Sequence, residues 1–158
     1  MEEIKMSEYH VTNKTIMVFA EGTILKPKSW LSIYNHDSYI PIGKSVFIIR
    51  GWVEQGANII YCTSRRGKQA QTIANILIRN GFAGTKLLFR SKRETYTELV
   101  ELIQPDILIE DDCKSIGGTW QMCITKVRPE IKEKIISVVV KEFGGIDDLP
   151  INISDFSN

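Results

Sequence analysis

Short polar stretches follow apolar runs at several points in this chain of 158 residues, and their side chains are of types that bind anions or metal ions. The first is TIMVFAEGTIL, residues 15–25, in which an apolar run leads into Glu21 and a Gly-Thr pair. TSRRG at residues 63–67, RSK at residues 90–92 and EDD at residues 110–112 follow later in the chain. Carboxylates, hydroxyls and cations in this combination indicate a site for phosphate chemistry.

The TSRRG stretch has the features of an anion site, because a hydroxyl and free backbone N–H groups at a helix N-terminus attract negative charge. Thr63 and Ser64 supply the hydroxyls, and the two arginines add positive charge. Lys92 stands where a helix begins, which is unfavourable for a cation and indicates an anion nearby. Ordinary helix capping and a solvated lysine are the alternative interpretation.

The EDD stretch has the features of a cation site. Glu110, Asp111 and Asp112 directly follow an apolar run, and adjacent carboxylates repel one another unless a cation or water relieves the repulsion. Mg²⁺ suits one or two such carboxylates together with a substrate phosphate. A solvated acidic turn is the alternative interpretation.

The elements that must position these stretches alternate between strands and helices. Apolar runs predict strands at residues 15–19, 57–63, 86–89 and 106–110, and a further one at 122–125. Apolar residues at helical spacing, followed by glycine or proline, predict helices at residues 43–55, 67–80 and 93–104. Residues 128–145 suit a strand at IISVVV, but Pro129, the charged flanks and the Gly-Gly end favour a helix.

This alternation predicts an α/β fold, a three-layer Rossmann-like parallel sheet of about five strands with helices on both faces. Such sheets bind ligands at the carboxyl ends of their strands, where the polar stretches fall. The length suits a single domain over residues 1–158. We interpret residues 20–42, which are long for a loop, as a minimal cap insertion, and residues 146–158 as an irregular tail.

Composition restricts the classes of partner. The net charge of +1 predicts no nucleic-acid partner, and the absence of an apolar run of about 20 residues predicts no membrane partner. The polar N-terminus lacks the pattern of a signal peptide, so we expect a cytoplasmic protein. Three cysteines without a CxxC pair indicate neither a disulfide framework nor a zinc site.

Taken in order, these stretches resemble the motifs of the haloacid dehalogenase-like superfamily, whose usual first motif is Asp-x-Asp-Gly-Thr. The resemblance covers about residues 14–125, and it is carried by FAEGT, then TS, then a lysine that leads a helix, then EDD. It implies a phosphatase-like scaffold in which residues 24–42 take the place of a minimal cap.

The resemblance also implies roles for individual residues. Gly22 and Thr23 match the family's Gly-Thr and, with Thr63 and its neighbour Ser64, belong to the phosphate-binding set. Glu21 falls on the second acid, the general acid/base of family phosphatases, whose backbone carbonyl is a metal ligand.

The remaining matches concern charge. Lys92 falls on the lysine that pairs with nucleophile and phosphate. Asp111 falls on the metal-binding acid, with Asp112 beside it, and the metal would be Mg²⁺.

The chain departs from the family at the nucleophile, because Phe19 occupies the position of the first aspartate. Phenylalanine can neither attack phosphorus nor ligate Mg²⁺, so we expect lost or strongly altered catalysis and weak Mg²⁺ binding. The interpretation is a domain that binds a phosphorylated small molecule or acts as a regulatory module.

Other interpretations remain open. One is an active Mg²⁺-dependent phosphohydrolase in which Glu21 or Asp111 acts as base on a water molecule. A receiver-like signalling domain fits less well, because its acidic, Thr and Lys motifs would come in the wrong order. A parallel α/β domain with coincidental polar loops is the last.

Two structural expectations follow. The ends of the strands at residues 15–19, 57–63 and 106–110 should lie side by side. Phe19 should be buried against the cap segment, near Trp30 or Tyr34.

Overall fold

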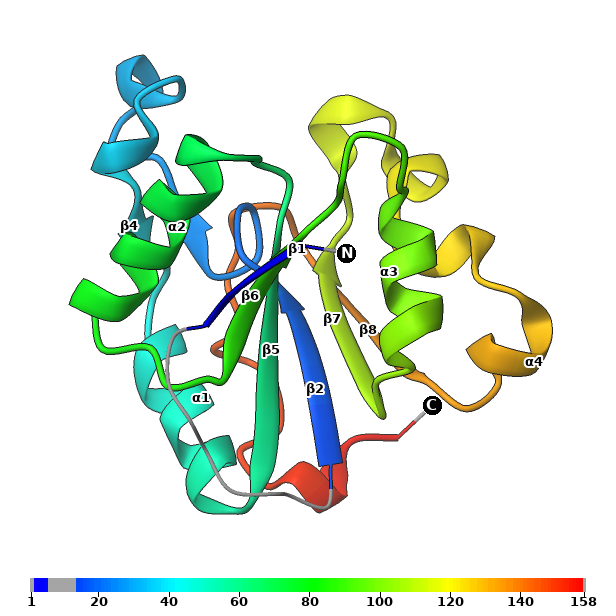
Figure 1. The fold of residues 1–158 in the computed structure, drawn as a ribbon. Helices are drawn as coiled ribbons and strands as arrows, with labels where there is room; N and C mark the ends of the chain where they lie inside the picture. Colours follow the sequence, from blue (N-terminus) through cyan, green and yellow to red (C-terminus); the bar gives the residue numbers. More distant parts are fainter. Residues whose placement is uncertain (1, 6–13, 158) are drawn as a thin grey trace.

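The computed structural model describes residues 2–5 and 14–157, and at its centre is a six-stranded sheet in the order β1-β6-β5-β2-β7-β8 (Figure 1). All neighbouring pairs are parallel except β1 with β6. The strands are β1 (Glu2–Lys5), β2 (Lys14–Phe19), β5 (Ala57–Thr63), β6 (Lys86–Phe89), β7 (Ile107–Asp111) and β8 (Ile136–Val140). The strands predicted at residues 57–63 and 86–89 are confirmed unchanged.

Helices cover both faces of the sheet, so the predicted three-layer fold class is confirmed (Figure 1). α1 (Ser45–Glu54) and α2 (Lys68–Arg79) pack on one face, and α3 (Tyr96–Ile103) and α4 (Pro129–Lys132) on the other. A separate cluster of buried side chains fills each interface. β2 serves both, because Ile16 and Val18 point into the first cluster and Met17 into the second.

Two predicted elements are wrong, and both lie after β7. Residues 122–125 do not form a strand, because the Cys123 and Ile124 amides donate to the Glu110 carboxylate at 2.7 and 3.0 Å. This bonding holds the segment as the 3₁₀ helix η5 (Cys123–Lys126). The helix predicted over residues 128–145 ends after α4, and its β-branched part forms β8 on the free edge of β7.

The segment at residues 20–42 has a small structure of its own. It contains β3 (Leu25–Lys26), η1 (Trp30–Ser32), η2 (His36–Ser38) and β4 (Ile40–Pro41), and β3 pairs with β4. We call these residues the cap. The Arg79 side chain donates to the Asp37 carbonyl at 2.8 Å and ties the cap to α2.

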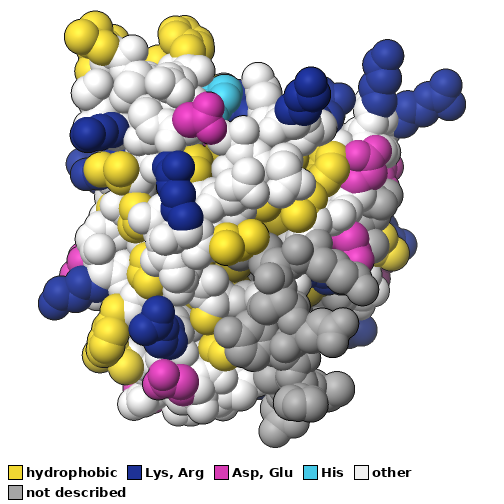
Figure 2. All heavy atoms as spheres, turned by 60° about the vertical axis from the view of Figure 1, so that its left-hand side comes forward, with side chains coloured by type: hydrophobic (Ala, Val, Ile, Leu, Met, Phe, Trp, Pro, Cys, Tyr) yellow, Lys and Arg dark blue, Asp and Glu magenta, His cyan; other side chains and the backbone are white. Residues whose placement is uncertain are grey.

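The tip of the cap faces outward. Trp30, Leu31 and Tyr34 are 84%, 91% and 91% exposed. In Figure 2, hydrophobic side chains project at the upper left of the molecule, and in Figure 1 the tip of the cap lies at the upper left. The base of the cap is anchored instead, since Leu25 and Tyr39 are buried in the cluster shared with α1 and α2.

The tail packs along α1 and includes the short η6 (Ile153–Asp155). The Trp52 indole donates to the Pro150 carbonyl at 3.0 Å, and the Phe156 ring meets Trp52 edge to face at 5.5 Å. The Lys44 amide, just after the cap, donates to Asp147 at 2.7 Å. Within residues 2–5 and 14–157, no helix has both the length and the apolar character needed to cross a membrane.

Phe156→Ala should lower the free energy of unfolding by about 3 kcal/mol, because it removes a buried ring from its contact with Trp52. Urea denaturation followed by circular dichroism measures the loss. Ile151→Ala is the control, because Ile151 lies in the same tail with 69% of its surface exposed. Equal losses from the two variants would show that the tail does not contribute to the core through Phe156.

Candidate functional site

The ends of three parallel strands meet at one edge of the sheet, as the sequence predicts. β2 lies between β5 and β7, with Phe19 opposite Cys62 and Val18 opposite Ile109. The residues at the ends of these strands therefore share one edge, to which Thr63 and Asp111, the last residues of β5 and β7, and Glu21, just after β2, belong.

The Glu21 carboxylate is surrounded by polar side chains from the end of β5 and the two residues after it. The Thr63 hydroxyl donates to the Glu21 carboxylate at 2.6 Å, and the Ser64 hydroxyl lies 3.4 Å from the same oxygen. The Arg65 guanidinium is 3.6 Å from this oxygen, and the Arg65 amide donates to the Thr63 hydroxyl at 3.1 Å. These residues, Glu21 and 63–65, form what we call the strand-tip cluster.

Burial is the largest influence on the protonation of Glu21 in the strand-tip cluster. Burial raises the pKa of Glu21, while the Thr63 hydroxyl and the Arg65 charge act against that rise. The donors are thus arranged around a carboxylate oxygen that has little access to water. Chemically, this arrangement can keep a proton on Glu21 or present its donors to another oxyanion.

The cap reaches the strand-tip cluster through Tyr39 and His36, which lie close enough for the Arg65 charge to act on both. The two rings contact each other at 5.6 Å, and the Tyr39 hydroxyl donates to the Ile33 carbonyl at 3.0 Å. Burial lowers the pKa of His36 and raises that of Tyr39. The sequence motifs gave no role to Tyr39, because its contact with the site depends on how the cap folds back.

Asp111 approaches the turn after β2 at Gly22. A Cβ at position 22 would lie 2.8 Å from Oδ1 of Asp111, and Gly22 has a φ of +84°, so glycine is required there on both counts. The Cys113 amide donates to the other Asp111 oxygen at 3.0 Å. Burial raises the pKa of Asp111, and the charges of Glu142 and Asp112 add to the rise.

Three other predicted site residues take no part in the hydrogen bonds that define the strand-tip cluster. Asp112 accepts hydrogen bonds from the Lys114 and Glu142 amides, each at 3.2 Å, which turns its carboxylate toward the backbone. Lys92 is exposed. Thr23 is fully buried, and its hydroxyl has no hydrogen-bond partner among the described residues.

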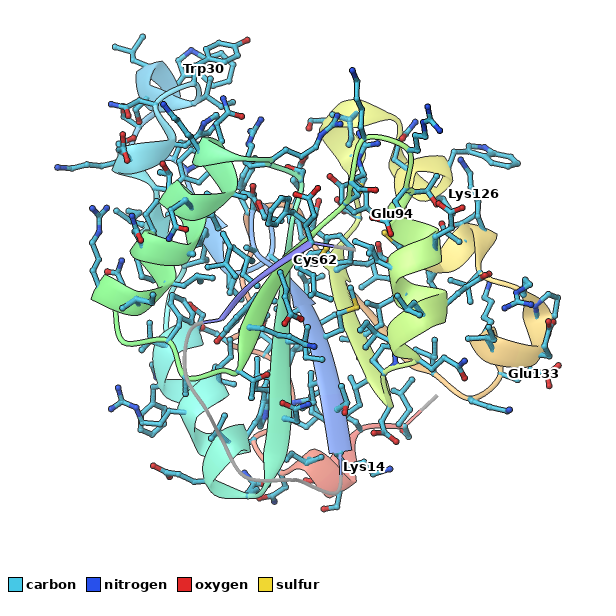
Figure 3. The ribbon with its side chains drawn as sticks, in the orientation of Figure 1. Lys14, Trp30, Cys62, Glu94, Lys126 and Glu133 are labelled. Carbon is cyan, nitrogen blue, oxygen red and sulfur yellow. The ribbon has the colours of Figure 1, made fainter. Side chains whose placement is uncertain are left out.

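Phe19 does not pack against the tip of the cap, so the expected contact with Trp30 or Tyr34 is wrong. Its ring meets Tyr96 of α3 edge to face at 5.7 Å. Side chains alternate along a strand, so residue 19 points to the α3 face, whereas the cap attaches to the other face. Figure 3 shows Trp30 at the far end of the cap, away from the end of β2.

The residues at this edge do not fit a strong Mg²⁺ site. Phe19 supplies no oxygen, and one oxygen of the Asp112 carboxylate, Oδ1, accepts from two backbone amides. The Asp111 carboxylate and the Glu21 carbonyl are the remaining predicted ligands. In the part of the chain that the structure describes, no group of three or more His, Cys, Asp or Glu residues is placed to hold a metal ion.

Comparison with known proteins shows the fold. No family model matches the sequence, and no curated protein matches it. The Pnkp1/Rnl/Hen1 RNA repair complex contains a chain with a TM-score of 0.57 and 14% identity, and the match covers 86% of this chain and 46% of that one. This chain therefore spans about half the length of that relative.

A class C acid phosphatase from Bacillus anthracis matches with a TM-score of 0.57, 15% identity, and coverage of 85% of this chain and 70% of that one. The same enzyme with tungstate bound matches with a TM-score of 0.56 and 14% identity over the same shares. These likenesses show that the chain shares the fold of these solved chains, and this is the fold that the sequence resemblance implies.

Glu21→Gln should make the protein less sensitive to rising pH. Burial raises the pKa of Glu21 in the folded protein, so the unfolded chain ionises first as the pH rises. Wild type therefore loses stability between the unfolded and folded pKa values and does not regain it above them. The melting temperature of the variant minus that of wild type should increase from about pH 4 to about pH 7.

Thermal melts of both proteins at several pH values, with EDTA present, measure this difference. Glu54→Gln on the exposed side of α1 is the control, and its difference from wild type should stay constant. A difference for Glu21→Gln that is also constant would contradict the assignment of a buried, proton-binding carboxyl at the strand tips.

Proposed function

We propose that this protein is a phosphatase-like domain without the usual nucleophile, which binds a phosphorylated small molecule at the strand-tip cluster. The observation that carries the proposal is the convergence of Thr63, Ser64 and Arg65 on one carboxylate oxygen of Glu21. Donors that hold a carboxylate oxygen can hold a phosphate oxygen in the same way, and charge-assisted bonds of this kind are the stronger ones.

Several further features support an oxyanion at this place. α2 begins shortly after Arg65, so its N-terminal dipole adds to the positive charge of residues 65–68. Tungstate is an oxyanion like phosphate, and a class C acid phosphatase of the same fold binds it. In this chain the Glu21 carboxylate occupies the donors and competes with any bound anion.

Phe19 supports a binding role over ordinary hydrolysis. It stands where the resemblance puts the attacking carboxylate, and its ring packs on Tyr96. In subtilisin, loss of the nucleophile costs about 2 × 10⁶ in kcat. If kcat falls by a factor of that size, binding is the property of the domain that can still be measured. Binding without turnover suits a regulatory role.

Thr63→Val should weaken the binding of inorganic phosphate about tenfold, because it removes one charge-assisted hydrogen bond. Glu21→Gln should strengthen the binding, because the competing negative charge is removed while the shape is kept. Isothermal titration with phosphate, in EDTA, measures both. Thr72→Val is the matched control. Thr72 lies one turn into α2, where its hydroxyl donates to the Lys68 carbonyl, and the variant should leave the affinity unchanged. Equal affinity of wild type and Thr63→Val would overturn the proposal.

Phe19→Asp should create a Mg²⁺ site beside Asp111 and allow slow hydrolysis of p-nitrophenyl phosphate. Mg²⁺ should then raise the melting temperature of the variant more than that of wild type, since the ion binds the folded state. Phe19→Asn is the control, because it loses the same ring without gaining a charge. An equal effect of Mg²⁺ on the two variants would place Phe19 away from the nucleophile position.

Hydrolysis of p-nitrophenyl phosphate by the wild-type protein would favour the alternative function, in which Glu21 or Asp111 acts as base on a water molecule.

A further inference from the structure

A pocket of about 410 Å³ opens between the first turn of α3 and the segment formed by η4 (Gly118–Gln121) and η5. Its volume lies in the range of small-molecule sites. Glu21 and residues 63–65 do not line it, so it is distinct from the strand-tip cluster. Figure 3 shows Lys126, one of its lining residues, on the far side of α3 from the cap.

The charge of the pocket favours an anion. Arg90 and Lys126 line it, and none of the described residues that line it is acidic. Glu98, one turn into α3, has its carboxylate engaged with the Thr95 amide and hydroxyl at 2.6 and 3.0 Å. Thr95, Tyr96 and Thr97 also line the pocket, and the Thr97 hydroxyl donates to the Cys123 carbonyl at 3.4 Å.

Arg90 is held in place while part of its guanidinium is unused. One nitrogen donates to the Glu94 carbonyl at 3.3 Å, and the guanidinium carbon lies 5.2 Å from the centre of the Tyr96 ring. Its Nε is buried and has no hydrogen-bond partner among the described residues. The planar guanidinium of an arginine that lines a pocket suits the binding of a phosphate by two of its nitrogens.

An aromatic wall completes the pocket. Tyr96 packs between Arg90 and Phe19, so its ring is fixed on two sides. Trp120 of η4 also lines the pocket and is 74% exposed. An exposed indole at the mouth of a cationic pocket offers a flat surface on which a planar ring can stack.

We propose that this pocket is a second binding site, which takes a small anionic molecule with a planar ring, of the nucleoside monophosphate class. The phosphate binds at Arg90 and Lys126, and the ring stacks at Trp120. Arg90 directly follows Phe89, whose neighbour across the sheet is Thr63, so the pocket begins beside the strand tips. The pocket is defined by its own residues and does not depend on phosphate binding at the strand-tip cluster.

Adenosine 5′-monophosphate, titrated into the full chain in EDTA, tests this inference. Wild type should bind it more tightly than it binds adenosine or inorganic phosphate, because only the nucleotide has both the ring and the charge. Trp120→Ala should weaken the binding about tenfold through loss of stacking. Arg90→Lys should also weaken it, because lysine keeps the charge and loses the planar fork.

Trp30→Ala is the matched control, since Trp30 is also an exposed indole but lies at the tip of the cap, and it should leave the affinity unchanged. Melting temperatures establish that each variant is folded. Equal affinity of wild type and Trp120→Ala, or adenosine monophosphate bound no more tightly than inorganic phosphate, would overturn the inference. The strand-tip proposal is tested separately with inorganic phosphate and Thr63→Val, so either proposal can fail while the other stands.

Discussion

The parallel hydrogen bonding of β2 between β5 and β7 is the constraint on which the rest of the molecule depends. It buries β2 between the two hydrophobic clusters and makes three strands end at one edge. Glu21 and Thr63 are 42 residues apart in the chain, and only this register brings their side chains to 2.6 Å. The close approach of Asp111 to Gly22 depends on the same register on the other side of β2.

Because β2 ends at Phe19, residues 19 and 21 lie in different surroundings. Residue 19 is turned toward α3, where the phenylalanine ring joins Tyr96 and becomes part of the packing. Glu21, beyond the strand end, is turned toward the residues after β5. An apolar contact therefore stands where the resemblance implies a reactive group, while the polar groups at this edge converge on Glu21.

The sequence predicts those parts of the fold that are decided locally. The strands at residues 57–63 and 86–89 are short apolar runs with clear ends, and the structure has them unchanged. The sequence allows a strand at β8 but favours a helix there because of the charged flanks, and only the free edge of β7 selects the extended form. β1 likewise depends on a distant edge, that of β6. The link from Glu21 to Thr63 follows from strand order, whereas the approach of Tyr39 to Arg65 depends on the path of the cap.

The bond between the Lys44 amide and Asp147 joins two parts of the chain that are remote in sequence, the exit of the cap and the start of the tail. A Cβ at Gly145 would lie 2.6 Å from the side chain of Ile42, so the backbones also run close together there. The tail in turn is fastened to α1 by Pro150 and Phe156. Residues 145–156 thus connect the end of the cap to α1, so a substitution that loosens their packing should also loosen the segment that carries His36 and Tyr39.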